Sequence, residues 1–129
     1  MKTKRLSPVL VVDAIEPALA FWVDKLGFNK TAEVPHDGKL GFVIFAHDGI
    51  EIMYQTKDSV AADVPPLAKS PQQGTFLFIE VDDLDAVVKQ LTGVTPVVPR
   101  RTTFYGSDEL IVREPCGNVV TFAQFAKED

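Results

Sequence analysis

Few residues of this chain have the types and spacing that metal binding or nucleophilic catalysis requires. Each of the two histidines, His36 and His47, begins a His-Asp-Gly tripeptide and has no third potential metal ligand close by in the sequence. Because Asp and Gly are typical turn residues, we predict that both histidines lie in solvent-exposed turns. The single cysteine, Cys116, has only Arg113 as a basic neighbour, which argues against a catalytic thiolate.

An aromatic pair interrupts a strand pattern late in the chain. Phe104 and Tyr105 precede Gly106, and an aromatic ring on a glycine-hinged segment can cover a bound ligand by stacking. Tyr105 is therefore a candidate gate over a binding site. The alternative is an ordinary packed tyrosine whose hydroxyl group lies in water.

Composition excludes several classes of protein. The chain has 129 residues, of which 46% are hydrophobic and 24% are charged, so it can form one compact domain with a real core. A formal net charge of -5 repels phosphate backbones and anionic membranes, so neither nucleic acid nor a membrane is an expected partner. One cysteine cannot form an intrachain disulfide, and the apolar run near the N-terminus is too short for a signal peptide or a membrane span. We therefore expect a cytoplasmic protein.

The apolar pattern of the first half predicts a βαβββ order. Residues 6–12 are typical of a buried strand, and apolar residues at helical spacing follow, with Asp13 and Glu16 at the spacing of a capping box. Trp22 falls on the apolar stripe of this helix, so it is expected in the core or in a dimer contact. Asp-Gly pairs predict type I′ turns between the next three strands, at 28–34, 40–46 and 50–55.

The same order returns in the second half, after a proline-containing segment at 61–73. A helix led by Asp82 and Asp83 is predicted up to Gly93, with strands at 75–81, 95–102, 109–113 and 118–125. The repeated order indicates an internal duplication.

The expected fold is therefore α+β, a single domain of residues 1–129. It consists of two βαβββ modules, 1–60 and 74–129, joined by a linker at 61–73. A helix over one face of each four-stranded sheet leaves the other face free. Curved together, the two free faces would form an eight-stranded cup with a central cavity for a ligand.

Four stretches of the chain resemble a known superfamily. They are Pro8-Val-Leu-Val-Val-Asp13, Phe21-Trp-Val-Asp-Lys-Leu-Gly-Phe28, Glu80-Val-Asp-Asp-Leu-Asp85 and Val112-Arg-Glu-Pro-Cys-Gly-Asn-Val-Val-Thr-Phe122. In this order they are similar to the glyoxalase / bleomycin resistance protein / extradiol dioxygenase superfamily, also called vicinal oxygen chelate proteins. The second and fourth stretches are similar in particular to bleomycin resistance proteins, which bind the drug without breaking it down. The resemblance implies paired βαβββ modules, a homodimer, and a cavity at or near the contact between modules.

Enzymes of this superfamily hold a divalent metal in the cavity. The resemblance places the four ligand positions at Ser7, Glu51, Phe76 and Thr121, of which only Glu51 is a strong metal ligand. Since a catalytic metal needs about three such ligands, we expect no metal and no other cofactor. The function expected is binding of a small molecule, with antibiotic sequestration as the use that the resemblance suggests. The alternative is a lyase, isomerase or dioxygenase with a degenerate or rearranged metal site that uses Glu51.

The register that the resemblance implies also places a set of side chains in the cup, because side chains alternate across a strand. The set combines apolar walls with a few polar groups, which is typical of a pocket for a small, cationic or aromatic molecule. The alternative is that these side chains merely fill the cup. The expected ligand-binding residues are Ser7, Val9, Glu51, Met53, Phe76, Phe78, Tyr105 and Thr121.

Glu51 is the most informative residue of this set. An unpaired charge in a partly apolar cavity would be costly, so the carboxylate is expected to have a partner. It could bind a cationic ligand or act as a general base. The alternative is a structural ion pair with Arg100, Arg101 or Arg113.

Overall fold

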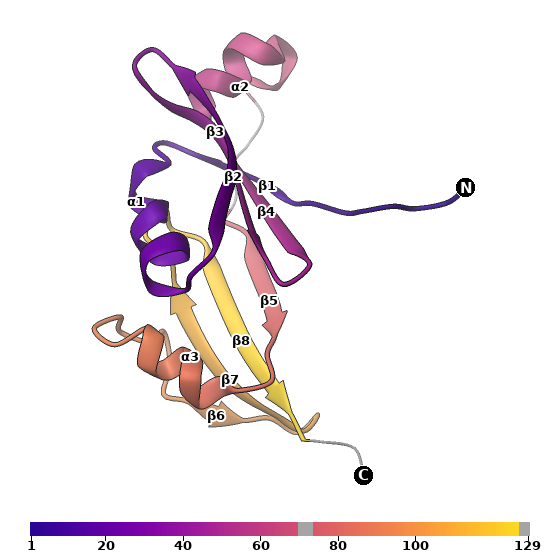
Figure 1. Ribbon diagram of the computed structural model, residues 1–129, viewed down its shortest axis with the longest axis vertical. Helices are drawn as coiled ribbons and strands as arrows, with labels where there is room; N and C mark the ends of the chain where they lie inside the picture. Colours follow the sequence, from indigo (N-terminus) through magenta and orange to yellow (C-terminus); the bar gives the residue numbers. More distant parts are fainter. Residues whose placement is uncertain (70–73, 127–129) are drawn as a thin grey trace. The chain divides into compact units, whose positions relative to one another are not determined.

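The structure is a computed structural model that describes residues 1–69 and 74–126 (Figure 1). It divides into two compact units, with the boundary before Gly74. Each unit contains one four-stranded mixed sheet, and the order of elements along the chain confirms two βαβββ modules. Within the predicted linker, positions 70–73 lie outside the described residues. No helix in the described part of the chain is long and apolar enough to cross a membrane.

The first sheet has the strand order β1-β4-β3-β2. β1 (Val9–Val12) pairs in parallel with β4 (Ile50–Thr56), while β3 (Lys39–His47) lies antiparallel between β4 and β2 (Asn29–His36). β1 is shorter than the predicted strand because Pro8 has no N–H to donate, and only its carbonyl joins the ladder, accepting from Met53 at 3.0 Å.

One face of this sheet carries the core of the first module. The helical segment consists of α1 (Glu16–Leu19) and the π-helical η1 (Ala20–Lys25). Trp22 is fully buried, and its indole Nε1 donates to the Tyr54 hydroxyl on β4 at 2.8 Å. The prediction that Trp22 lies in the core is therefore confirmed. The other buried strand residues on this face are Leu10, Val12, Val43, Phe45 and Ile52.

The predicted capping box at the start of the first helix is wrong. α1 has Ile15 as its N-cap and no side-chain cap. The Asp13 carboxylate instead pairs with Lys57 at 2.9 Å, and Glu16 accepts from the Leu40 backbone N–H at 3.0 Å. Both carboxylates thus bind groups that are distant in the sequence rather than the start of their own helix.

The two hairpin turns are confirmed, but the histidines beside them are not turn residues. Asp37 and Asp48 have φ of 49° and 45°, and the glycine after each also has positive φ, as a type I′ turn requires. Because the turn needs only Asp and Gly, His36 and His47 remain as the last residues of β2 and β3, half-buried. The His47 ring stacks on Phe28 with 4.9 Å between ring centroids.

The second sheet has the strand order β5-β8-β7-β6. β5 (Phe76–Glu80) pairs in parallel with β8 (Val119–Phe125), and β7 (Ser107–Arg113) lies antiparallel between β8 and β6 (Arg101–Thr102). The predicted strand at 95–102 is mostly wrong. Within this segment, pairing with β7 is limited to β6 and to an isolated bridge at Pro96. Pro96 and Pro99 cannot donate to a ladder.

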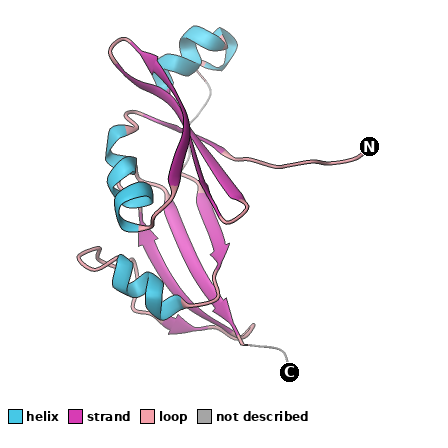
Figure 2. Cartoon of the chain, in the orientation of Figure 1, coloured by secondary structure: helices cyan, strands magenta, loops and turns pink. Residues whose placement is uncertain are grey.

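Helix α3 (Leu84–Gln90) packs against β7 and β8 (Figure 2). Asp83 caps its N-terminus by accepting from the Ala86 N–H at 3.1 Å, as the sequence predicted. α2 (Lys57–Asp63) and the 3-10 turn η2 (Pro65–Leu67) follow β4. The sheet face opposite the helix carries exposed apolar residues in each module, Val9 in the first and Phe76 and Phe78 in the second.

Candidate functional site

The open face of the first sheet carries the predicted residues of the first module. Val9 lies opposite Met53 in the register of β1 and β4, and it is 46% exposed. Glu51 is two positions before Met53 on β4, so its side chain lies on the same face. Ser7, just before β1, reaches the same place, because its hydroxyl contacts the Glu51 carboxylate.

Two residues that precede β1 hold the carboxylate of Glu51. Ser7 Oγ donates to Oε1 at 3.0 Å, and Arg5 Nη1 lies 3.4 Å from both Oε1 and Oε2. The Glu51 side chain is 19% exposed, whereas that of Arg5 is 70% exposed. The ion pair is therefore open to water, and a cationic ligand could exchange with Arg5.

Three arginines of the second module were the alternative partners that the sequence offered for Glu51, whereas the structure pairs Glu51 with Arg5 of its own module. Each of those arginines is engaged within its own module, by an acid or by a backbone carbonyl. The contacts are Arg100 with Asp85 at 2.6 Å, Arg101 with Glu109 at 2.9 Å, and Arg113 with the Gly117 carbonyl at 3.0 Å.

A pocket of about 450 Å³ opens beside Glu51. Its lining carries charges of both signs, from Arg5, Asp48 and Glu51, together with the half-buried His47. Apolar contact comes from Leu6, Ala46 and Ile50. The pocket therefore suits a polar molecule that presents a cationic group to a carboxylate.

The open face of the second sheet is aromatic. Phe76 and Phe78 on β5 are 81% and 54% exposed. Phe76 lies opposite Val119 and Phe78 lies opposite Thr121, so the structure brings the predicted residues of the second module to one face. An exposed apolar patch of this kind is typical of a surface that contacts a ligand or another protein.

Four rings on this module form a continuous series of contacts, which we call the aromatic row: Phe78, Phe125, Tyr105 and Phe104. Ring centroids are 6.3 Å apart between Phe78 and Phe125, and 6.4 Å apart between Phe125 and Tyr105. Phe104 meets Tyr105 edge to face at 5.1 Å and is fully exposed. The row offers a flat molecule several aromatic faces and edges.

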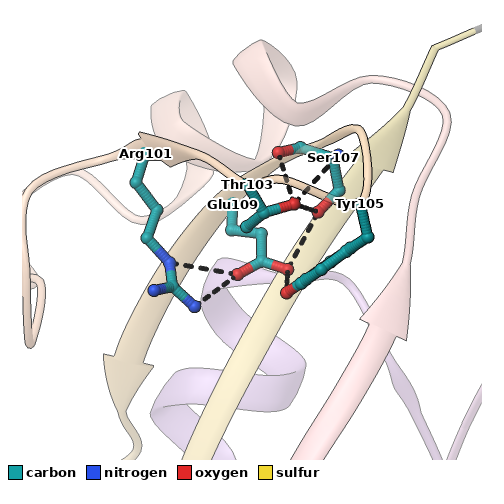
Figure 3. Close-up of polar contacts among 5 residues, drawn as sticks. All are labelled: Arg101, Thr103, Tyr105, Ser107 and Glu109. Atoms are coloured by element: carbon teal, nitrogen blue, oxygen red, sulfur yellow. Dashed lines mark hydrogen bonds and ion pairs between the residues drawn. The ribbon is translucent and has the colours of Figure 1, made fainter.

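Sequence reasoning missed a buried acid beside this row, Glu109 on β7 (Figure 3). It is 1% exposed and lies opposite Arg101 and Ala123 in the register. Oε1 accepts from Arg101 Nε and Nη2 at 3.2 and 2.9 Å, while Oε2 accepts from Ser107 Oγ at 2.9 Å and from the Tyr105 hydroxyl. The apolar pattern at 109–113 indicated only a strand. Ser107 and Glu109 are polar and two positions apart, and this spacing was the one sequence signal for polar side chains on this face.

The environment of Glu109 favours its ionised form. Burial raises the pKa of this carboxyl, but the hydrogen bonds from Tyr105, Ser107 and Arg101 and the charge of Arg101 lower it by more. The pKa of Glu109 therefore lies below the ordinary glutamate value.

Tyr105 lies in the short loop between β6 and β7. Its side chain is 45% exposed, but its hydroxyl donates to Glu109, so the alternative of a hydroxyl group in water is wrong. The Gly106 N–H donates to the Thr103 carbonyl at 3.1 Å, and Gly106 has φ of 88°, which closes a tight turn. That Tyr105 covers a bound ligand stays a prediction.

The donor set on these faces does not fit a catalytic divalent metal. Within residues 1–69 and 74–126, no group of three or more His, Cys, Asp or Glu side chains lies close enough to hold an ion. Glu51 already lies against Arg5, and Glu109 lies against Arg101. A metal at either carboxylate would have to replace an arginine and find its remaining ligands elsewhere.

Comparison with known proteins places the chain in a family. A family model described as the Glyoxalase/Bleomycin resistance protein/Dioxygenase superfamily matches residues 5–122. No curated protein matches the chain significantly.

Solved structures show the same fold. The bleomycin-binding protein of Streptomyces verticillus, solved with copper(II)-bleomycin, is 26% identical over 99% of both chains, with a TM-score of 0.65. TioX from Micromonospora sp. ML1 is 16% identical over 96% of this chain and 100% of its own, with a TM-score of 0.75. Lactoylglutathione lyase from Agrobacterium tumefaciens is 18% identical over 96% and 95%, with a TM-score of 0.76. The chain therefore belongs to the Glyoxalase/Bleomycin resistance protein/Dioxygenase superfamily.

Proposed function

We propose that this protein binds a small, planar molecule with positive charge and sequesters it without chemical change and without a metal. The observation that carries the proposal is the aromatic row on the open face of the second module. Stacking of flat rings on aromatic side chains contributes about 1 to 3 kcal/mol per ring to binding of nucleobases, which have comparable flat faces. The carboxylate of Glu51 and the net charge of -5 favour a cation.

The bleomycin-binding protein supports an antibiotic as the first ligand to test. It is 26% identical over nearly the whole chain, and it was solved with copper(II)-bleomycin. Under the proposal, a cytoplasmic homodimer would protect its host by lowering the free concentration of such a drug. Sequestration requires only affinity, so the lack of a fitting metal site is compatible with it.

Titration calorimetry with metal-free bleomycin and with copper(II)-bleomycin tests the proposal. We expect the wild-type protein to bind at least one form. Replacement of Phe78 by alanine is expected to weaken binding about tenfold, because it removes one stacking surface from the aromatic row.

Val88→Ala is the matched control for this experiment. Val88 is 38% exposed on α3, which packs on the covered face of the second sheet. The control variant is expected to bind as the wild type does. Absence of binding to both forms of the drug, or an equal loss in Val88→Ala, would contradict the proposal.

A lyase or dioxygenase that uses Glu51 is the second candidate function, favoured by the pocket beside that carboxylate. Such chemistry in this superfamily relies on a divalent metal, so elemental analysis separates the two candidates. Protein purified without a chelator is expected to carry much less than one divalent metal ion per chain. Zinc, nickel, manganese or iron at one ion per chain would instead support the enzyme.

A further inference from the structure

The loop between β6 and β7 is tied to the sheet through the side chain of a buried acid. We infer that Glu109 is a positioning residue, whose carboxylate fixes the Tyr105 ring against Phe125 and so assembles the aromatic row before a ligand arrives. This inference rests on the proposed function, which gives the row its role. Glu109 thereby contributes to binding although it does not itself touch the ligand.

The carboxylate of Glu109 is immobile because both of its oxygens are held (Figure 3). Arg101 on β6 approaches Oε1 with two N–H donors, at 3.2 and 2.9 Å. Ser107, at the start of β7, donates to Oε2 at 2.9 Å. The hydroxyl of Tyr105 donates to the same Oε2 from the loop. The carboxylate that accepts from Tyr105 is thus itself held by residues of two strands, β6 and β7.

The backbone of the loop is closed independently of this contact. Thr103 N–H donates to the Ser107 carbonyl at 2.9 Å, and Ser107 N–H donates to Thr103 Oγ1 at 3.1 Å. The hydroxyl groups of Thr103 and Ser107 are also 2.9 Å apart. Removal of the Tyr105 hydroxyl therefore leaves a formed loop, in which only the direction of the ring is released.

The released ring would be free to change rotamer. Its side chain is 45% exposed, and its ring contacts with Phe125 and Phe104 have centroid distances of 6.4 and 5.1 Å. A ligand that stacks on a mobile ring has to immobilise it, and ordering one side chain of this kind costs about threefold to tenfold in affinity. The hydrogen bond to Glu109 removes that cost in advance.

Three variants separate ring placement from general stability of the hairpin. Tyr105→Phe keeps the ring and removes the hydroxyl, while Glu109→Gln keeps the size of the acceptor and removes its charge. Thr102→Ala is the matched control, because the Thr102 hydroxyl bonds Asp108 at 2.8 Å on the other face of the same hairpin. Affinity for bleomycin is measured for each variant and for the double variant of Tyr105 and Glu109.

We expect Tyr105→Phe and Glu109→Gln each to lose about threefold to tenfold in affinity, and the double variant to lose no more than the larger single loss. Thr102→Ala is expected to bind as the wild type does. Additive losses in the double variant, or an equal loss in Thr102→Ala, would overturn the inference.

A measurement without ligand keeps the inference testable if bleomycin does not bind. The chain has two tyrosines, so tyrosine-labelled protein gives ring NMR signals for Tyr105 and for the fully buried Tyr54, which serves as the internal reference. In Glu109→Gln we expect the Tyr105 signals to move toward those of a freely rotating tyrosine, with the Tyr54 signals unchanged. Unchanged Tyr105 signals would show that Glu109 does not place the ring, whatever the ligand proves to be.

Discussion

Replacement of Trp22 by alanine is expected to lower the free energy of unfolding by about 3 to 5 kcal/mol, the range typical of large aromatic residues removed from a core. Trp22 is fully buried on η1 and packs edge to face on Phe21 and Phe28, with ring centroids 5.0 and 4.9 Å away. The variant also loses the hydrogen bond that joins this helical segment to Tyr54 on β4. Urea unfolding followed by far-UV circular dichroism measures the loss, because the variant lacks the only tryptophan.

Trp22→Phe serves as the matched variant for this prediction. It keeps an aromatic ring in the core but removes the indole N–H, so we expect a smaller loss of about 1 to 2 kcal/mol. A loss below about 1 kcal/mol for Trp22→Ala would mean that the site collapses around the smaller side chain. That outcome would contradict the close packing of the helical segment on the first sheet.

The pattern of strands and helices could be predicted because it depends on local chemistry. The Asp-Gly pair at 37–38 forms the expected turn, since positive φ at both residues follows from their small or polar side chains. Alternation along β4, in the register that the resemblance implies, likewise placed Glu51 on the open face, and the neighbouring Ile52 is buried. Where prolines interrupt the predicted strand at 95–102, the ladder is reduced to an isolated bridge at Pro96 and the two-residue strand β6.

The partners of charged residues could not be predicted in the same way. Glu51 pairs with Arg5, which belongs to a segment without any apolar periodicity, so no pattern indicated where that side chain lies. Asp13 likewise pairs with Lys57, 44 positions away. Such pairs depend on which strands lie side by side and on their register, and neither can be read from spacing along the chain.

Glu109 shows the same limit at the candidate site. Its network needs Arg101 from β6 to lie opposite β7, with Tyr105 and Ser107 in the connecting loop and strand start. The sequence predicted that Tyr105 has a role, through its place before a glycine. It could not predict the buried acid, because the register between two short strands decides which residue Arg101 faces.

Glu109→Gln is expected to lower the free energy of unfolding by about 2 kcal/mol at neutral pH, within the range for hydrogen bonds to charged groups. The loss is moderate because the Arg101 side chain is 52% exposed, so water can solvate its guanidinium group in the variant. The pKa of Glu109 is lower in the folded than in the unfolded protein, so its ionised form contributes stability above the ordinary glutamate pKa of about 4.3. That contribution disappears as the pH falls through the lower, folded pKa.

The difference in stability between wild type and Glu109→Gln is therefore expected to shrink on acidification. Urea unfolding at a series of pH values from about 7 to about 2 measures this difference directly. Asp108→Asn is the matched control, since Asp108 is the neighbouring acid on β7 and its side chain is 48% exposed. We expect the control to lose less stability at neutral pH than Glu109→Gln does, because the Asp108 side chain is half exposed. A Glu109→Gln difference that stays constant with pH would show that shape and packing, rather than the ionised carboxylate, account for its contribution.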